Sequence, residues 1–512
     1  MTADHQSGGA VRGNVKTNGW SAIPWKFLKM LKNYCLNTTI HGLRYFVEED
    51  RHIVERAFWL VCVAVSWVCA VLLVQEAWYA FRYNPINFVV QPAEPGSATS
   101  FPSVIICPRD NRPVIKKFTK RYLKTKSKVD IFQFGDALKE VVYFTGRLAS
   151  YRTVCMKDNV FDPDSKCFRN NFTHLVYSLQ MKCKDLFDTC HWRGEEINCC
   201  DNFLPLHSDR GICFAINNVN TWKDGRRPST AIDMTSNGTT KEPRLVVKFK
   251  EITTTDWPVA FVMPKEGIPY YGITHWKFIE YQKMYFQRYV ITEVYNDHLV
   301  PSVDPEVRQC RFSWETDGLK HYKRYSHSKC ILECRRQKEL EICGCNTPLM
   351  PFAEEKDVCD IEGLLCHHMT EKLYRLKPKS SNDTNAIYCQ CPSGCEELEI
   401  DETFNSVVER KDLGDIATLD ISLERSSSLH YRRVVVRGSL DMVVNIGGTL
   451  GLFIGASLLS LVEIIHYFVL PLIFGVKDTP KTPVKTTGIT MFNRRVKAQY
   501  QRHLHSVPSM FY

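Results

Sequence analysis

The stretch that most constrains this chain runs from Asp441 to Val476, DMVVNIGGTLGLFIGASLLSLVEIIHYFVLPLIFGV. Between its end residues, Glu463 carries the only formal charge. At about 1.5 Å per residue, a straight helix of this length would far exceed the roughly 30 Å hydrocarbon core of a membrane, so a simple anchor does not need it. An ionisable group inside an apolar span is costly and is kept mostly where it faces water or a pore. The segment is therefore predicted to line an ion pathway.

The glycines of the same segment allow a second interpretation. Gly447, Gly451 and Gly455 form two overlapping small-xxx-small frames, which commonly indicate only close helix packing. Glu463 would then extend toward the inner membrane interface. Periodicity alone does not separate a packed anchor from a pore helix.

A second apolar run predicts another membrane helix. Residues 57–74 carry no charge, follow Arg51 and Arg56, and precede Trp78 and Tyr79. Basic residues on the inner side and aromatic residues on the outer side are typical of a helix that enters from the cytosol.

The net charge of +10 is concentrated at the two ends of the chain, with +3 in residues 1–56 and +6 in residues 477–512. Cytoplasmic flanks are expected to be basic, whereas nucleic-acid binding would need a basic face on a folded domain. The chain is thus predicted to have both termini in the cytoplasm, to contact membrane lipid and to bind no nucleic acid. The predicted segments are a cytoplasmic N-terminus at 1–56, a first transmembrane helix at 57–77, an extracellular domain at 78–440, a second transmembrane helix at 441–474 and a basic cytoplasmic tail at 475–512.

The cysteines indicate where the middle of the chain lies. Eighteen of the 21 fall between Cys107 and Cys395, and the sequons at Asn171, Asn237 and Asn382 occupy the same interval. Together they predict an oxidised, glycosylated extracellular domain.

Two details of composition have alternatives. The spacing Cys343-Gly344-Cys345 would also suit a metal ion, but disulfides are far commoner outside the cell, so no metal is expected. A further sequon at Asn37 is placed in the cytosol and is expected to stay unmodified.

Runs rich in β-branched residues predict strands at 245–249, 288–295 and 432–437. Helical signals are concentrated near residues 330–340 and in the earlier segments rich in Lys and Asp. The extracellular domain is therefore predicted to be α+β with a sheet core.

The string NIGGTLGLFIGASLLSLVE closely resembles the second membrane segment of the degenerin/epithelial sodium channel (amiloride-sensitive) family. RQCRFSWE, CGCNTPLMPF and YCQCPSGC resemble the arthropod pickpocket branch of that family. The resemblance implies a palm, finger and thumb type of extracellular domain. It also implies that Gly455, Ala456 and Ser457 form the selectivity filter and that Glu463, repeated by symmetry, forms a ring that concentrates cations.

The resemblance implies further gating residues. His41-Gly42, a turn signal by itself, resembles the cytoplasmic His-Gly gating motif of the family. Asn445 and Gly448 correspond to pore-lining positions. The family usually has a small residue before that asparagine, where this chain has Val444, so a raised resting open probability is expected.

The cysteine spacing leaves the disulfide pairing open, but the resemblance implies a nested ladder that staples a helical thumb. It also places Cys107 and Cys213 among the bridged cysteines, and it does not decide how Cys155, Cys167, Cys183, Cys190, Cys199 and Cys200 pair. The implied ladder is Cys310–Cys395, Cys330–Cys391, Cys334–Cys389, Cys343–Cys366 and Cys345–Cys359.

These features predict a two-span plasma-membrane protein that assembles as a homo- or heterotrimer with related subunits. Its expected function is passive, amiloride-sensitive sodium transport in sensory or epithelial cells, with sodium as the permeant ion, no cofactor and no enzymatic activity. Three alternatives share some of the features: an ATP-gated cation channel, a two-pass scavenger or lipid receptor, and a non-conducting accessory subunit. The ATP-gated class does not share the filter string or the His41-Gly42 pair. A scavenger receptor needs only plain anchors, which would not explain Glu463 and the glycine-rich run, and sequence does not exclude the third alternative.

Overall fold

The computed structural model places the chain in two units, a helical unit formed by Met1–Trp78 with Ser439–Tyr512, and a sheet unit formed by Tyr79–Gly438. The predicted basic tail at 475–512 lies outside the described residues, as do residues 1–21 of the predicted N-terminal segment. The described residues are 22–92, 98–123, 130–158, 160–222, 228, 231–236, 242–251, 256–273, 275–377, 386–410, 416–424 and 429–474.

The helical unit contains one long apolar helix and one bent pair. Helix α3, Ile53–Tyr83, has a mean hydropathy of 2.6 over its most apolar window, of which only 6% is buried. Such an exposed apolar surface suits lipid, and the helix is long enough to cross a membrane. Helix α13 and the helical segment Leu458–Val469 meet at 70° and, counted as one span, form a second candidate among the described residues. The other helices of the unit are α1 (Ala22–Asn37), α2 (Leu43–Val47), α13 (Ser439–Ile454), α14 (Leu458–Ile464), the π-helix η8 (Ile465–Val469) and α15 (Leu470–Phe474).

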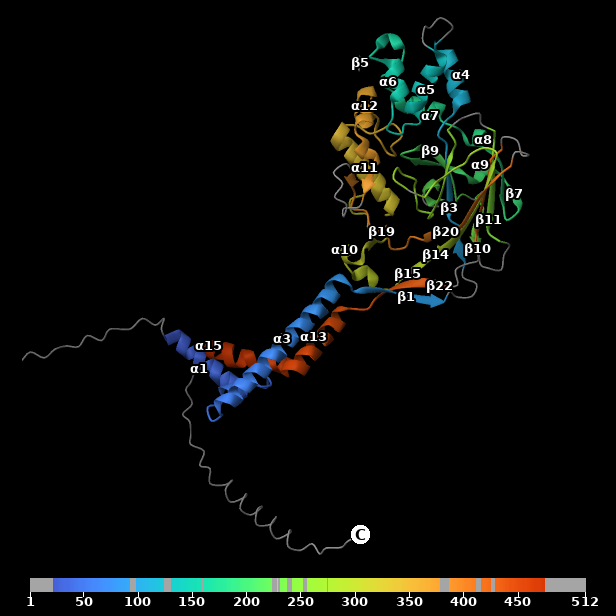
Figure 1. The fold of residues 1–512 in the computed structure, drawn as a ribbon. Coiled ribbons are helices and arrows are strands. Elements are labelled where there is room, and N and C mark those ends of the chain that lie inside the picture. Colours follow the sequence, from blue (N-terminus) through green and yellow to red (C-terminus); the bar gives the residue numbers. More distant parts are fainter. Residues whose placement is uncertain are drawn as a thin grey trace, which may run out of the picture. The chain divides into compact units, whose positions relative to one another are not determined.

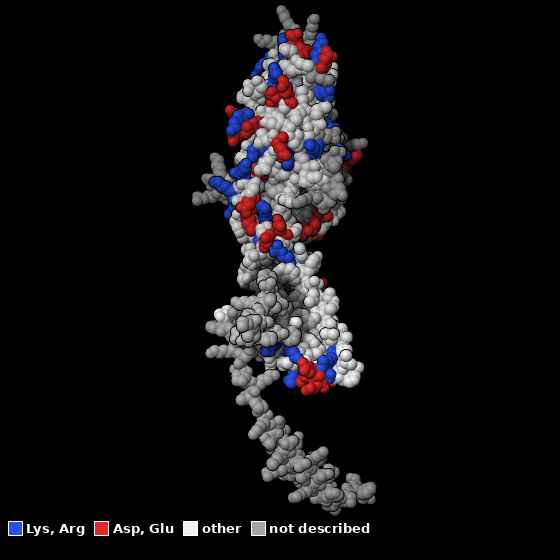
Figure 2. Space-filling view, turned by 90° about the vertical axis from the view of Figure 1, so that its left-hand side faces the viewer, with Lys and Arg blue, Asp and Glu red and all other residues white. Residues whose placement is uncertain are grey.

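Helix α1 packs against η8 through aromatic rings. The Tyr34 ring centroid lies 5.8 Å from that of Tyr467 and 5.3 Å from that of Phe468, and Phe27 lies 6.0 Å from Phe468. These contacts fix the N-terminal segment beside the end of the bent pair. In the face shown in Figure 2, the described surface of the helical unit is largely uncharged apart from one cluster of both signs.

The sheet unit is built on two sheets, and strands lie at all three predicted places (Figure 1). The predicted run 288–295 is divided between strands of different sheets, because β14 pairs with β20 and β21 whereas β15 pairs with β22. The larger sheet has the order β20 (Glu399–Glu409), β14 (Lys283–Thr292), β21 (Thr418–Leu423), β11 (Arg244–Phe249), β6 (Phe187–Trp192) and β7 (Glu195–Ile197). The smaller sheet has the order β13 (Lys277–Phe278), β12 (Val259–Met263), β3 (Ser103–Cys107), β9 (Gly211–Ile216) and β8 (Leu204–Ser208).

Helices gather at one end and one side of these sheets (Figure 1). The apolar faces of α5, α7 and α12 share a core that includes Phe134, Phe172 and Leu364. A separate core, with Val247 and Leu419 at its centre, fills the space against the larger sheet. The helices are α4 (Arg112–Leu123), α5 (Ile131–Val142), α6 (Ala149–Cys155), α7 (Phe172–Leu179), α11 (His327–Cys343) and α12 (Ile361–Met369).

Disulfides connect elements that are far apart in the sequence. Five of them bind α11 and the segments on either side of it to the chain around α12 and beyond, and they are the pairs that the family resemblance implied. Cys343 and Cys345 are both bridged, Cys343 to Cys366 and Cys345 to Cys359. The remaining bridges are Cys107–Cys213, Cys155–Cys167, Cys183–Cys200 and Cys190–Cys199.

The two segments that connect the sheet unit to α3 and α13 are bonded to each other. Strand β1, Ile86–Pro92, pairs antiparallel with β22, Leu429–Val435, and β15, Val294–Asn296, pairs parallel with β22. The Arg437 guanidinium also donates to the carbonyl of Asn84 at 2.7 Å. Movement of one connection is therefore transmitted directly to the other.

Candidate pore site in the helical unit

The apolar segment breaks at Gly455-Ala456-Ser457, the residues to which the family resemblance assigns the selectivity filter. Helix α13 ends at Ile454, and Gly455 has φ +70°, a left-handed conformation that favours glycine. Helix α14 begins after Ser457, whose hydroxyl accepts a hydrogen bond from the Ser460 N–H at 3.4 Å. The Ser457 N–H donates to the Ser460 hydroxyl at 3.1 Å, which completes a capping box. Local chemistry thus dictates both the end of one helix and the start of the next.

The His41-Gly42 pair lies directly against this break. The His41 N–H donates to the carbonyl of Ile454 at 2.9 Å, so it satisfies one of the free carbonyls at the end of α13. The imidazole of His41 lies so close to Gly455 that any side chain at position 455 would collide with it. Gly42 has φ +86°, and a Cβ there would collide with Val63 of α3. Glycine is therefore required on both sides of this contact.

The residues just before His41 bind the carboxylate of Glu463. Its Oε2 accepts hydrogen bonds from the Thr39 N–H at 3.0 Å, from the Thr38 hydroxyl at 3.1 Å and from the Thr39 hydroxyl at 3.2 Å. The Thr39 and Ser460 hydroxyls also form a hydrogen bond at 3.0 Å. Several donors on one oxygen fix the position of the Glu463 carboxyl group.

The structure brings together only some of the predicted site residues. His41, Gly42, Gly455 and Glu463 form one cluster with Thr38, Thr39 and Ser460. Val444, which is 63% exposed, lies on α13 outside this cluster. Asn445 and Gly448 are also exposed on α13, and nothing lies within 4 Å of a Cβ built at Gly448.

Thr38, Thr39 and Ser460 were missed by the sequence analysis. The two threonines lie some 420 residues from their partners, as the separations of 425 for Thr38–Glu463 and 421 for Thr39–Ser460 record. Their position next to the His-Gly pair was the available signal. Hydroxyl residues occur throughout the chain, so that signal is weak.

Among the predicted glycosylation sites, Asn171 is exposed immediately before α7. Asn237 and Asn382 lie outside the described residues. The site residues of the sheet unit are otherwise the bridged cysteines.

Comparison with known proteins matches residues 34–467 to the family described as amiloride-sensitive sodium channel. The chain is 23% identical over 470 residues to the Sodium channel protein Nach of Drosophila melanogaster, covering 85% of this chain and 86% of that protein. It is 24% identical over 503 residues to Pickpocket protein 28 of Drosophila melanogaster, covering 85% of this chain and 77% of that protein. It is 23% identical over 497 residues to Acid-sensing ion channel 4 of Mus musculus, covering 89% of this chain and 83% of that protein. Because the family match extends from before the His-Gly pair to beyond Glu463, this chain belongs to the amiloride-sensitive sodium channel family, and an arthropod pickpocket-type subunit fits its relatives.

Proposed function

We propose that this chain is a subunit of a sodium-preferring, amiloride-sensitive cation channel of the plasma membrane. Members of its family are ion channels, not enzymes, and have a large extracellular domain. In the proposal, α3 and the bent α13–α14 pair are the two spans, and both termini lie in the cytoplasm. Three subunits, identical or related, surround one pore.

The broken helix supplies the proposed filter. Irregular backbone is tolerated at membrane depth where it lines a water-filled path, and the break at residues 455–457 is such a segment. Carbonyl oxygens there, with the Ser457 hydroxyl, would replace part of the hydration shell of sodium. A ring of Glu463 carboxylates would raise the local cation concentration.

One observation carries this proposal: residues 38–42 hold both parts of the pore segment. His41 binds the end of α13, and Thr39 binds Glu463 on α14. A plain membrane anchor does not need a separate loop that fixes its break and its carboxylate. A preorganised filter does, since its oxygens must keep their positions while ions pass.

The test is whole-cell current in oocytes that express the chain. External sodium is exchanged for a large impermeant cation, and amiloride is added. The proposal expects an inward sodium current that amiloride blocks and that Gly455→Arg abolishes. Gly194→Arg is the matched control, because Gly194 also has a left-handed conformation, φ +84°, but has open space around it in the β6–β7 turn.

Surface labelling measures how much of each variant reaches the plasma membrane, so that a loss of current can be told from a loss of protein at the surface. A wild-type chain that reaches the surface without sodium current, alone or with related subunits, would contradict conduction and favour an accessory role. Current evoked by ATP would instead favour an ATP-gated channel. Loss of current in both arginine variants would remove the assignment of the filter to Gly455.

The proposal includes a raised resting open probability caused by Val444. The residue is bulky and largely exposed on α13, so it is available for contacts with other subunits. Val444→Gly should lower the resting current at equal surface expression. An unchanged resting current would remove this part of the proposal.

A further inference from the structure

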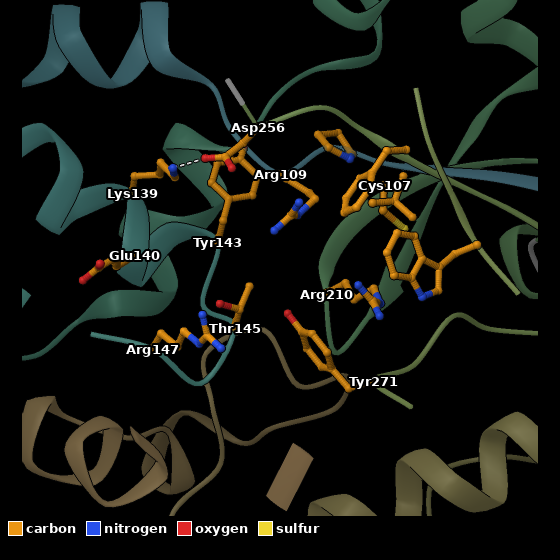
Figure 3. A pocket seen from close by; sticks show the side chains of 14 residues that line it. Cys107, Arg109, Lys139, Glu140, Tyr143, Thr145, Arg147, Arg210, Asp256 and Tyr271 are labelled. Atoms are coloured by element: carbon orange, nitrogen blue, oxygen red, sulfur yellow. Dashed lines mark hydrogen bonds and ion pairs between the residues drawn. The ribbon is translucent and has the colours of Figure 1, made fainter. Parts of the chain in front are cut away.

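A cavity of about 390 Å³ opens in the sheet unit between α5 and the smaller sheet (Figure 3). One wall comes from α5 and the segment that follows it, and the other comes from the ends of β3, β12 and β13 together with Tyr271. Its volume is within the range of small-molecule sites, which is about 300–1,000 Å³. The cavity shares no residue with the candidate pore site.

In the part of the chain that the structure describes, three guanidinium groups of the cavity lining have no acidic ion-pair partner. Arg109 and Arg210 are half-buried, and Arg147 is exposed at the opening. Among the described residues, no carboxylate lies within ion-pair distance, 4.0 Å, of any of the three. The Nε atom of Arg210 is buried and has no hydrogen-bond partner there.

The acidic groups of the lining are already engaged. Asp256 pairs with Lys139 (Figure 3). Glu140 points away from the cavity and accepts hydrogen bonds from the Ser150 N–H at 2.9 Å and the Tyr151 N–H at 3.0 Å. The lining holds four basic side chains, Arg109, Lys139, Arg147 and Arg210, against these two acidic ones, so an excess of positive charge remains around one space.

Such an arrangement is unfavourable unless an anion joins it. Like charges repel, and a buried donor without an acceptor loses the hydrogen bond that it would make with water. Aromatic faces hold two of the arginines in place, since Arg210 lies 4.4 Å from the Tyr271 ring centroid and Arg109 lies 5.1 Å from that of Phe278. They are thus positioned before any ligand arrives.

The aromatic side chains Trp276 and Phe278, here called the aromatic wall, indicate which class of anion the cavity would bind. Trp276 is 38% exposed and meets Phe278 edge to face at 4.5 Å between centroids, and Val259 and Pro108 line the same cavity. An inorganic anion would use the guanidinium groups but leave this apolar surface in contact with water. An organic anion with an apolar body would use both, because arginine binds carboxylates through paired hydrogen bonds and the ring faces bury the body.

We propose that this cavity binds a small organic anion, with its carboxylate among Arg109, Arg147 and Arg210 and its apolar body against Trp276 and Phe278. The site lies wholly in the sheet unit and does not depend on ion conduction. The affinity of the cavity for the anion should fall as ionic strength rises, because Arg147 is exposed to solvent and Arg109 and Arg210 are only half-buried.

The test measures binding of 2-naphthoate to the purified full chain in detergent by equilibrium dialysis at low salt. Neutral 2-naphthamide and inorganic phosphate are dialysed in parallel. The proposal expects saturable binding of 2-naphthoate and at least about tenfold weaker binding of 2-naphthamide, the factor that one charge-assisted hydrogen bond supplies.

Variants then locate the site. Arg147→Gln and Arg109→Gln should each weaken 2-naphthoate binding by about tenfold, since each removes charge-assisted hydrogen bonds. Arg147 is exposed, so its replacement leaves the fold intact. Arg121→Gln is the matched control, because Arg121 is exposed on α4 outside the cavity and its replacement removes the same charge.

Several results would overturn the proposal. Equal affinities for 2-naphthoate and 2-naphthamide would show that charge is not recognised. Binding of phosphate without binding of 2-naphthoate would show that the aromatic wall is not used. Unchanged 2-naphthoate affinity in Arg147→Gln and Arg109→Gln, or an equal loss in Arg121→Gln, would place the binding elsewhere.

Discussion

At the scale of single residues, one added methyl group at Gly455 should be strongly destabilising. Gly455→Ala combines a left-handed backbone, which costs a non-glycine residue about 1–2 kcal/mol, with a collision against the His41 ring. We expect a clear loss of thermal stability in detergent and loss of current. Adding His41→Gly should recover the collision part of the stability loss but not the backbone part.

Gly447→Ala is the control for this prediction, because a Cβ at Gly447 meets nothing within 4 Å. Alanine inside a helix is better than glycine by about 0.5–1 kcal/mol, so the control should be neutral or slightly stabilising. A Gly455→Ala variant as stable as the control would mean that the His41 contact is not formed in the protein.

A buried carboxyl in α11 should make the stability of the sheet unit depend on pH. Glu339 is 1% exposed, and its carboxyl accepts the Thr347 N–H at 3.1 Å. Burial raises the pKa of Glu339 to about 8, against smaller lowering effects of the Thr347 hydrogen bond and of Arg335. The folded state therefore holds a proton that the unfolded state releases above its ordinary pKa of 4.5.

The sign follows from this difference in bound protons. Below about pH 4.5 the raised pKa of Glu339 does not lower the free energy of unfolding. Between about pH 4.5 and pH 8 it lowers the free energy of unfolding by about 1.4 kcal/mol per pH unit. Glu339→Gln should remove this part of the slope, as measured by denaturant unfolding between pH 5 and 8. Glu341→Gln, at a 63% exposed side chain on the same helix, should leave the slope unchanged. Identical slopes for wild type and Glu339→Gln would contradict the raised pKa.

At the scale of elements, α11 depends on its disulfides more than on an apolar stripe. Ile331 and Leu332 are buried, but so are Lys329, Glu333 and Arg335 on the same helix. Arg335 forms a buried ion pair with Asp209. Because polar groups fill so much of the buried surface, covalent bridges hold this helix in position.

Removing two neighbouring disulfides of the ladder, Cys330–Cys391 and Cys334–Cys389, should have a non-additive effect on the free energy of unfolding. Removing either Cys330–Cys391 or Cys334–Cys389 alone, by replacing both of its cysteines with serine, should cost about 2 kcal/mol, because the remaining bridge keeps the same chain segments together. Removing both rungs should cost about 5 kcal/mol, which exceeds the sum, because a much longer loop is then released in the unfolded chain. Denaturant unfolding of the full chain measures each value. A double loss no larger than the sum would argue against the loop-entropy account.

Elements also show what could be predicted from sequence. The break at Gly455-Ala456-Ser457 was predictable because its causes are local, namely a glycine that accepts left-handed backbone and a serine that caps a helix. The pairing of Cys183 with Cys200 rather than with Cys199 was not predictable. Cys199 and Cys200 are adjacent in the sequence, and only the folded chain decides which of them faces Cys183. The contact of Thr39 with Glu463 was also hidden, since no local pattern records a partner 424 residues away.

At the scale of the whole molecule, the two ends of the chain and the sheet unit should lie on opposite sides of a membrane. The excess positive charge of the chain is concentrated in its terminal segments, while nine disulfides lie between Cys107 and Cys395. Basic flanks stay in the cytoplasm, and disulfides form in oxidising compartments. Helix α3, which is apolar and leads directly into β1, is the segment suited to cross between the two sides.

Two sequons test this topology because both have described structures. Asn171 is exposed at the start of α7 in the sheet unit, whereas Asn37 is the last residue of α1 and donates to the Asn33 carbonyl at 2.8 Å. Glycans are added only on the luminal side, so Asn171→Gln should remove one glycosidase-sensitive step in gel mobility and Asn37→Gln should remove none. Attachment of the glycan at Asn37 would place the N-terminal segment outside the cell. The loop that carries His41 would then be extracellular, and the proposed pore would have to be inverted with its Glu463 ring facing the outer solution.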